Sequence, residues 1–268
     1  MLSDQESGRG TLRLVSIFLA LSTFAPLPAM AANDRPWEPG WSVVPYGWLA
    51  GFDGEIGVNS AGLDPGGGLG LADLVEFSTD GELEEIGFML YAAWRGERWS
   101  AAVDSVWANV KQDAKLVLRG LLPDSSLRLT IDGNIYHATL GYLLSETERS
   151  ALVAYGGARY YDVELVVDAS GGLLPSPVSA SGSTQWLDAT AGLRWTYRPS
   201  PRWDITALAD FGAGDSDASW QVFATIGYHF SWGAIRAGYR RLDVDYQSGD
   251  YVLDAALEGP LVGVAFQF

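Results

Sequence analysis

The stretch that decides the fold is WDITALADF, residues 203–211. Apolar side chains occupy every second position from Trp203 to Phe211, and three of the four positions between them are polar, namely Asp204, Thr206 and Asp210. Successive side chains of a β-strand point to opposite faces of the sheet. The stretch therefore predicts a strand with one apolar face and one mostly polar face.

The same alternation continues along most of the chain. It is regular in 187–197 (LDATAGLRWTY), in 220–230 (WQVFATIGYHF) and in 261–268, which ends the chain. It is less regular in 41–58, 86–95, 99–110, 127–144, 152–167 and 234–246. Half of the chain is hydrophobic (48%), yet beyond residue 31 it has no run of about 18 apolar residues such as a transmembrane helix needs. An all-β fold accounts for both facts.

The segments between these strands are of two kinds, which alternate along the chain. Four are short, at 95–98, 145–150, 198–202 and 231–233, and five are longer and polar, at 59–83, 119–126, 168–183, 212–219 and 247–250. An up-and-down transmembrane barrel has this arrangement, with short turns at one end and longer loops at the other. We therefore expect an all-β fold, a closed up-and-down antiparallel transmembrane β-barrel of about ten strands, with both termini at the end of the short turns.

Aromatic residues flank the short segments, and such residues gather where a barrel crosses the membrane interface. The predicted membrane-interface aromatics are Trp94, Trp99, Trp195, Tyr197, Trp203, Phe230 and Trp232. A soluble β-sandwich would also alternate, but it leaves these aromatic pairs and the sorting of turns by length unexplained.

Composition excludes several classes of function. The 268 residues carry a net charge of −16, and a nucleic-acid partner is excluded because no basic stripe is available to contact phosphates. The chain has no Cys, which excludes disulfides, thiolate metal sites and a lipid anchor. We expect no cofactor and no metal.

The N-terminal segment resembles an export signal. Arg9 and Arg13 precede a short apolar run, and Ala29-Met30-Ala31 has the small residues that signal peptidase requires. We expect residues 1–31 to be a cleavable signal peptide, 32–40 an N-terminal periplasmic segment, and 41–268 the barrel.

Two further stretches carry a family resemblance. The closing GPLVGVAFQF, residues 259–268, is similar to the last strand of bacterial outer-membrane barrels, and PYGWLAG, residues 45–51, together with Gly238-Tyr239-Arg240, resembles a group of small, mostly uncharacterised barrels of Gram-negative outer membranes. The resemblance implies an outer-membrane location, contact with outer-membrane lipid, and recognition by the barrel assembly machinery through Val264, Phe266 and Phe268. It implies no activity.

Strand phase assigns a set of ionisable residues to the interior. These are Asp53, Glu55, Asp104, Arg159, Asp162, Asp188, Arg194, Asp204, Asp210, His229, Arg236 and Arg240. The apolar set changes face at Tyr160-Tyr161 and at Arg240-Arg241, which we attribute to β-bulges near the membrane rim. Because a barrel of about ten strands is narrow, we expect these charges to pair and plug it.

The sequence leaves three functions open. The first is a structural or surface-interaction scaffold with a charge-plugged lumen, which we prefer. The second is a narrow channel that prefers cations, because Asp outnumbers Arg in the assigned interior. The third, less favoured, is a hydrolase that uses His137 or His229. Asp210 with Asp215-Ser216-Asp217 is weighed as a Ca²⁺ site, and a solvated turn is the preferred interpretation.

Overall fold

The structure is a computed structural model that describes residues 35–58, 76–77, 88–114, 125–171, 178–248 and 251–268. The expected signal peptide, residues 1–31, lies outside the described residues. No helix in the described part of the chain is long and apolar enough to span a membrane.

Strands make up nearly all of the described chain, and they form one antiparallel sheet. In chain order they are β1 (Gly40–Trp48), β2 (Gly51–Val58), β3 (Glu76–Phe77), β4 (Phe88–Arg95), β5 (Trp99–Ala114), β6 (Ser125–Glu146), β7 (Ser150–Gly171), β8 (Val178–Ser200), β9 (Trp203–Gly214), β10 (Ala218–His229), β11 (Ala234–Ser248) and β12 (Tyr251–Gln267). Each strand from β4 to β11 pairs with the next one along the chain.

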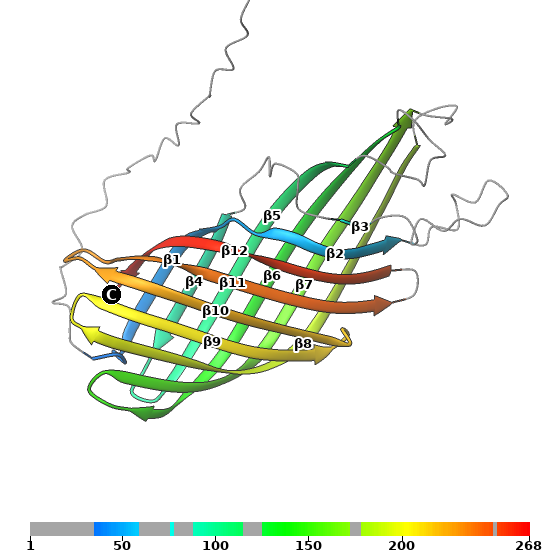
Figure 1. The fold of residues 1–268 in the computed structure, drawn as a ribbon. Coiled ribbons are helices and arrows are strands. Elements are labelled where there is room, and N and C mark those ends of the chain that lie inside the picture. Colours follow the sequence, from blue (N-terminus) through cyan, green and yellow to red (C-terminus); the bar gives the residue numbers. More distant parts are fainter. Residues whose placement is uncertain (1–34, 59–75, 78–87, 115–124, 172–177, 249–250) are drawn as a thin grey trace, which may run out of the picture.

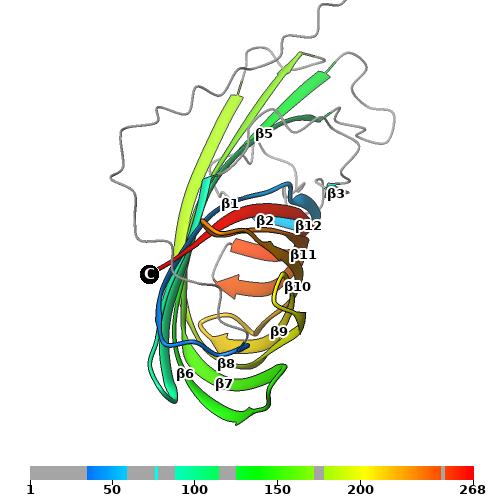
Figure 2. The same cartoon turned by 90° about the vertical axis from the view of Figure 1, so that its left-hand side faces the viewer.

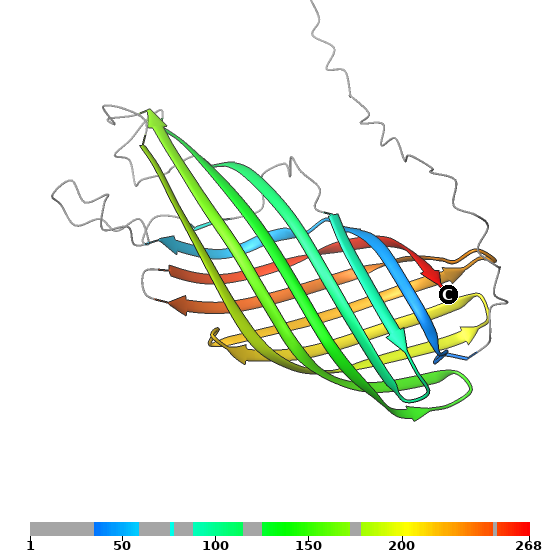
Figure 3. The same cartoon turned by 180° about the vertical axis from the view of Figure 1, so that it is seen from behind.

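The sheet closes into a barrel because β1 pairs with both β4 and β12. At the seam, Trp41 and Phe268 exchange two backbone hydrogen bonds, of 3.0 and 2.9 Å. β2 continues β1 along the same neighbour, β12, so the two form one barrel strand. With β4 to β12 this makes ten, which confirms the predicted closed barrel (Figures 1 and 3).

The interruption between β1 and β2 lies beside Gly259 of β12. A Cβ atom at Gly259 would stand 1.9 Å from the carbonyl oxygen of Leu49. Only glycine lets the two backbones approach this closely, and Leu49 N donates a 2.9 Å hydrogen bond to the Pro260 carbonyl next to it. The absence of a side chain therefore keeps the seam closed where the strand breaks.

The four short connections lie together at one end of the barrel, which we call the short-turn end. They comprise residues 96–98, 147–149, 201–202 and 230–233. The described chain begins and ends at this end, where Figure 1 marks the C-terminus.

In two of the segments expected to be long loops, the flanking strands extend further than the sequence predicted. Only residues 215–217 separate β9 from β10, and only 249–250 separate β11 from β12. The ladders continue into both stretches, 212–219 and 247–250, as the pairs Ser219 with Gly212 and Ser248 with Tyr251 show. Their polar composition reflects the position of these strand ends on the barrel and not a loop. The four strands β5 to β8, by contrast, project beyond the rest of the barrel (Figure 2).

Exposure alternates along the strands in the sense that the sequence predicts. On β10, Val222, Ala224 and Ile226 are exposed, whereas Gln221 and Thr225, which alternate with them, are buried. The exterior is thus apolar and the interior polar. A water-soluble fold has the opposite arrangement.

Further from the short-turn end, the polarity of both faces is reversed. On β11 the outward side chains change from Ile235 and Tyr239 to Arg241, while the inward ones change from Arg240 to Leu242. The same change occurs at matching heights on three other strands. The outward pairs there are Tyr136 and Asn134 on β6, Tyr160 and Asp162 on β7, and Leu187 and Gln185 on β8.

The expected β-bulges at Tyr160-Tyr161 and Arg240-Arg241 are therefore wrong. Both ladders are regular through these pairs, and register shifts occur instead between Leu143 and Ser145 and between Tyr197 and Ser200. At Tyr160-Tyr161 and at Arg240-Arg241 the side chains continue to alternate without a change of face. What changes is the surroundings of each face, and the sequence follows them.

Candidate functional site

The interior contains a cavity of about 150 Å³ that extends inward from the short-turn end. We call it the cup. Its lining comes from inward-facing side chains of β1, β4 to β12 and of the segment before β1, and includes the exposed residues Arg35 and Gln267 at the short-turn end. The cup is therefore open toward that end of the barrel.

An apolar cluster, which we call the plug, closes the other side of the cup. Three stacked rings form its centre, because Trp186 lies between Tyr161 and Tyr246 with ring centroids 4.5 and 4.2 Å away. These rings come from β7, β8 and β11, and Leu242 among them is 0% exposed. The other buried members are Trp48, Met89, Val106, Ile135, Val244 and Leu261.

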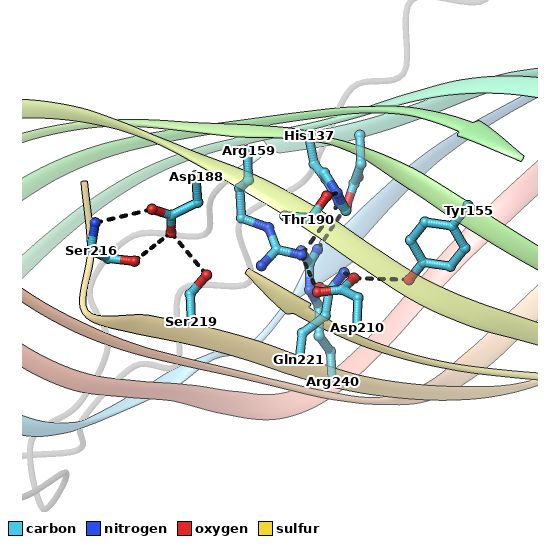
Figure 4. Close-up of polar contacts among 11 residues, drawn as sticks. His137, Tyr155, Arg159, Asp188, Thr190, Asp210, Ser216, Ser219, Gln221 and Arg240 are labelled. Atoms are coloured by element: carbon cyan, nitrogen blue, oxygen red, sulfur yellow. Dashed lines mark hydrogen bonds and ion pairs between the residues drawn. The ribbon is translucent and has the colours of Figure 1, made fainter. Parts of the chain in front are cut away.

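On the short-turn side of the plug, a charged cluster links β7 to β9 and β10 (Figure 4). Arg159, which is 0% exposed, donates a 2.6 Å hydrogen bond to Asp210. The Tyr155 hydroxyl and the Gln221 amide donate to the other oxygen of the same carboxylate, at 2.8 and 2.5 Å. Charge-assisted hydrogen bonds are the strong ones, so Asp210 is a node that joins three strands.

Asp188 has a separate set of partners and no ion pair with a described residue. Its carboxylate accepts hydrogen bonds from the backbone N–H of Ser216 (3.1 Å), from the Ser216 hydroxyl (2.6 Å) and from the Ser219 hydroxyl (2.9 Å). Figure 4 shows the β9–β10 turn reaching to it. Asp215 caps the Leu187 N–H at 3.0 Å, so this turn is held on the edge of β8.

The candidate Ca²⁺ site is not assembled, because Asp210, Asp215 and Ser216 have different partners. Asp210 bonds to Arg159, Asp215 caps a backbone N–H, and Ser216 bonds to Asp188. Their oxygens do not converge.

A second ion pair crosses the interior between β5 and β11. Arg240 donates to Asp104 at 2.9 Å and to the Tyr46 hydroxyl at 3.0 Å, and that hydroxyl donates to Asp104 at 2.7 Å. The Arg240 guanidinium also lies 4.9 Å from the ring centroid of Trp48 in the plug. The pair therefore connects the plug with the wall of the cup.

A third cluster lies nearer the short-turn end. Asp204 accepts two hydrogen bonds from Arg236, at 2.5 and 2.8 Å, and forms a short contact with His229. Both ends of this carboxylate are thus occupied. A bidentate arginine fixes its orientation as well as its charge.

The segment before β1 folds into the mouth of the cup. Trp37 is buried and donates its indole N–H to the Gly96 carbonyl at 3.0 Å, while Arg198 bonds to the Arg35 carbonyl at 3.0 Å and lies 3.6 Å from Glu38. Burial raises the pKa of the Glu38 carboxyl, despite the attraction of Arg198. Sequence reasoning missed these contacts, since nothing in the polar stretch around Trp37 indicates where it packs.

Neither histidine lies in a catalytic arrangement among the described residues. His137 contacts the Thr190 hydroxyl at 2.9 Å, but its other ring nitrogen faces Arg159 at 3.4 Å and not an orienting carboxylate (Figure 4). His229 has a carboxylate partner in Asp204, but no hydroxyl nucleophile bonds to it. A general base needs both an orienting group and a nucleophile within reach.

Of the residues assigned to the interior whose side chains the structure describes, Asp162 alone does not face it. Asp162 lies on the outer face, where Gln185 donates to it at 3.2 Å, because Tyr161 and Arg159 occupy the inward positions. Asp53 and Glu55 lie in β2, and their side chains fall outside what the structure describes.

The expectation that interior Asp outnumbers interior Arg is also wrong. Among described residues the cup is lined by six arginines and three carboxylates, and Arg159, Asp188 and Asp210 are buried in the interior outside its lining, so arginines outnumber carboxylates. Arg95 and Arg198 were overlooked in the sequence because they stand beside the short turns.

The predicted interface aromatics lie together on the outer surface at the short-turn end. Trp203, Tyr228, Phe230 and Trp232 form a chain of ring contacts with centroids 4.9, 4.8 and 5.4 Å apart. Trp232 also lies 6.2 Å from Phe266 of the C-terminal strand. Trp99 contacts Tyr142 at 5.0 Å, and Trp195 stacks on Tyr197 at 5.7 Å.

A second ring of aromatics, which sequence reasoning missed, lies at the height where polarity changes. Phe88, Trp107, Tyr136 and Tyr160 follow one another across β4 to β7 with centroids 5.8, 6.1 and 6.4 Å apart. Each lies near the last apolar position of its outer face. That position in the alternation was the available signal.

No protein-family model matches the sequence, and no curated protein matches it. Among solved structures, the chain is similar to the outer membrane protease OmpT from Escherichia coli, with a TM-score of 0.53 at 9% identity over 88% of this chain and 99% of that one. The translocator domain of the autotransporter NalP from Neisseria meningitidis gives a TM-score of 0.43 at 14% identity, over 86% and 89% of the two chains. The likeness to OmpT shows the fold alone, a closed antiparallel β-barrel.

Proposed function

We propose that this chain is an integral outer-membrane barrel with a closed lumen, which serves as a scaffold that holds β5 to β8 and their polar outer face outside the membrane. The observation that carries the proposal is the reversal of polarity. An apolar exterior with a polar interior changes, at one height, to a polar exterior with an apolar interior.

Contact with lipid accounts for the half of this pattern nearer the short-turn end, where the exterior is apolar. On β8 the outward apolar side chains run from Tyr197 to Leu187, ten residue steps. At about 3.3 Å per residue and a tilt of about 45°, these steps span about 23 Å along the barrel axis, close to the ~25 Å apolar band of known outer-membrane barrels. Aromatic residues border the band on both sides, as at the two interfaces of a membrane.

Contact with water accounts for the half of the pattern further from the short-turn end, where the exterior is polar. There the outer face carries Arg241, which bonds to Asp243 at 2.9 Å and to Glu258 at 2.8 Å. Such pairs on a lipid-facing surface would be costly to bury, whereas in water they are ordinary. The plug then serves as the core of this water-exposed part of the barrel.

The closed lumen argues for a scaffold over a channel. Three stacked rings and Leu242 fill the interior above the cup, and the Arg159–Asp210 and Arg240–Asp104 pairs cross it below. A conducting path needs continuous water. The channel remains the second candidate because the cup opens at the short-turn end, but solute passage would require the plug to move.

Planar-bilayer recording tests the proposal. The purified protein should insert without stepwise current, and replacing Tyr161, Trp186 and Tyr246 together by alanine should introduce conductance because it removes the plug rings. Trp195→Ala, on the outer surface, is the matched control and should remain silent. Regular current steps from the unmodified protein would refute the closed lumen, and recovery of the expressed chain in the soluble fraction would refute the membrane location.

A further inference from the structure

The cup carries an excess of positive charge, although the whole chain has a net charge of −16. Its arginines are Arg35, Arg95, Arg194, Arg198, Arg236 and Arg240. Its carboxylates are Glu38, Asp104 and Asp204. The most acidic chain segments thus lie elsewhere, and the interior is locally basic.

Each carboxylate of the cup already has an arginine. Asp104 pairs with Arg240, Asp204 with Arg236, and Glu38 with Arg198. Arg35 is exposed at the mouth. Within the described chain, Arg95 and Arg194 are therefore left in the cup without a carboxylate partner.

Aromatic rings hold both of these arginines in place. The Arg194 guanidinium lies 5.8 Å from the Tyr91 centroid and 5.6 Å from that of Tyr155, so two rings hold it. Arg95 lies 5.6 Å from the Trp37 ring, and its Nε is buried without a hydrogen-bond acceptor. Stacking of this kind orients a guanidinium but leaves its N–H donors free.

A third arginine of the cup also has unused donors. Arg240 is only 2% exposed, yet its Nε and one Nη have no hydrogen-bond partner among the described residues. Buried donors of a charged group are costly to leave without an acceptor. Three arginines that line one cavity therefore have little compensation from acceptors among the described residues, and an anion is the group that complements their charge.

The remaining lining limits what kind of anion fits. Val44, Leu208, Phe223 and Leu261 give the cup apolar walls between the arginines. Inorganic phosphate would meet the charges but would leave these walls in contact with water. A compact apolar body that carries one anionic group matches both features.

We propose that the cup is a binding site for a small organic anion, a carboxylate or phosphate monoester on a compact apolar body, held by Arg194 and Arg95 and entering from the short-turn end. Arg240 supplies further donors at the inner end. The site goes beyond the proposed scaffold role. It requires no opening of the plug, because the ligand reaches the cup from the short-turn end.

The test uses the purified full chain in an uncharged detergent, which removes anionic lipid as a competing ligand. Isothermal titration calorimetry is carried out with benzoate and phenyl phosphate as the two anions, and with benzamide and benzylamine as neutral and cationic probes of similar shape. Benzoate, phenyl phosphate or both should bind, the stronger one identifying the preferred head group, and the other two probes should not.

Arg194→Gln should weaken binding of the preferred anion at least about tenfold, the value of one charge-assisted hydrogen bond. Arg98→Gln is the control, because Arg98 is exposed on a short turn, and it should bind like the unmodified chain. Heat-modifiable electrophoretic mobility verifies that each variant is folded, and Arg95→Gln replaces Arg194→Gln if the latter does not fold. Equal binding of benzoate and benzamide, unchanged affinity of the folded variant, or no binding of either anion up to about 10 mM would overturn the proposal.

Discussion

Replacing Asp210 by asparagine should destabilise the barrel strongly, because Arg159 would then remain buried without a counter-charge. Both side chains of this pair are 0% exposed, and the bond between them is 2.6 Å long. Nε and Nη1 of Arg159 already lack partners, and Nη2 has, besides Asp210, only the His137 ring nitrogen at 3.4 Å, so no second carboxylate among the described residues compensates its charge. Asparagine keeps the size of the residue and an acceptor oxygen but removes the charge.

The magnitude follows from the cost of an unpaired buried charge. Removal of one partner of such a pair typically costs about 3–5 kcal/mol, whereas replacement of both partners by apolar residues is often neutral. We expect Asp210→Asn to lower the free energy of unfolding by about 3 kcal/mol. The double variant Arg159→Met with Asp210→Leu should lose less than the single one.

Urea unfolding in phospholipid vesicles, followed by tryptophan fluorescence, measures these differences. Glu258→Gln is the matched control, because it breaks the exposed Arg241–Glu258 pair, whose side chains are 36% and 39% exposed. Exposed pairs contribute at most about 1 kcal/mol. If Asp210→Asn and Glu258→Gln cost the same, the argument that the buried pair holds the interior together is refuted.

Two further predictions concern the outer wall and the mouth of the cup. Ala191→Arg places a charge in the middle of the apolar band and should cost about 2–4 kcal/mol in the same unfolding assay, while Ser183→Arg, above the band on the same strand, should cost close to nothing; similar costs at both positions would remove the case for lipid contact. Glu38→Gln should stabilise the chain at neutral pH, because the pKa of the Glu38 carboxyl is raised on folding. The folded state therefore binds the proton more tightly than the unfolded state, and the unmodified chain loses stability as the pH rises through the folded pKa, whereas the uncharged glutamine does not. The advantage should vanish when both measurements are repeated below the pKa of unfolded glutamate, and an advantage that persists there would show that the charge of Glu38 is not its cause.

The barrel wall was largely readable from the chain. Side chains alternate with a period of two, and lipid requires the outward set to be apolar, so segments such as 187–197 and 220–230 reveal both the strand and its faces. The number of barrel strands followed from the same pattern. The interpretation of the sequence was wrong at the height where the exterior changes from apolar to polar. The polar residues Asp162 and Arg241 suggested that the side chains change face, but the ladder continues there without a bulge.

The interior was decided by tertiary structure. The alternation indicates that Arg159, Asp210 and Arg194 point inward. It does not indicate which of them are in contact, because strand tilt and register decide which inward side chains lie opposite one another across the lumen. Asp210 pairs with Arg159, which is 51 residues away in the sequence, whereas the contacts of Arg194 within the described chain are with aromatic rings. A periodic pattern fixes the direction of a side chain, and only the closed barrel fixes its neighbour.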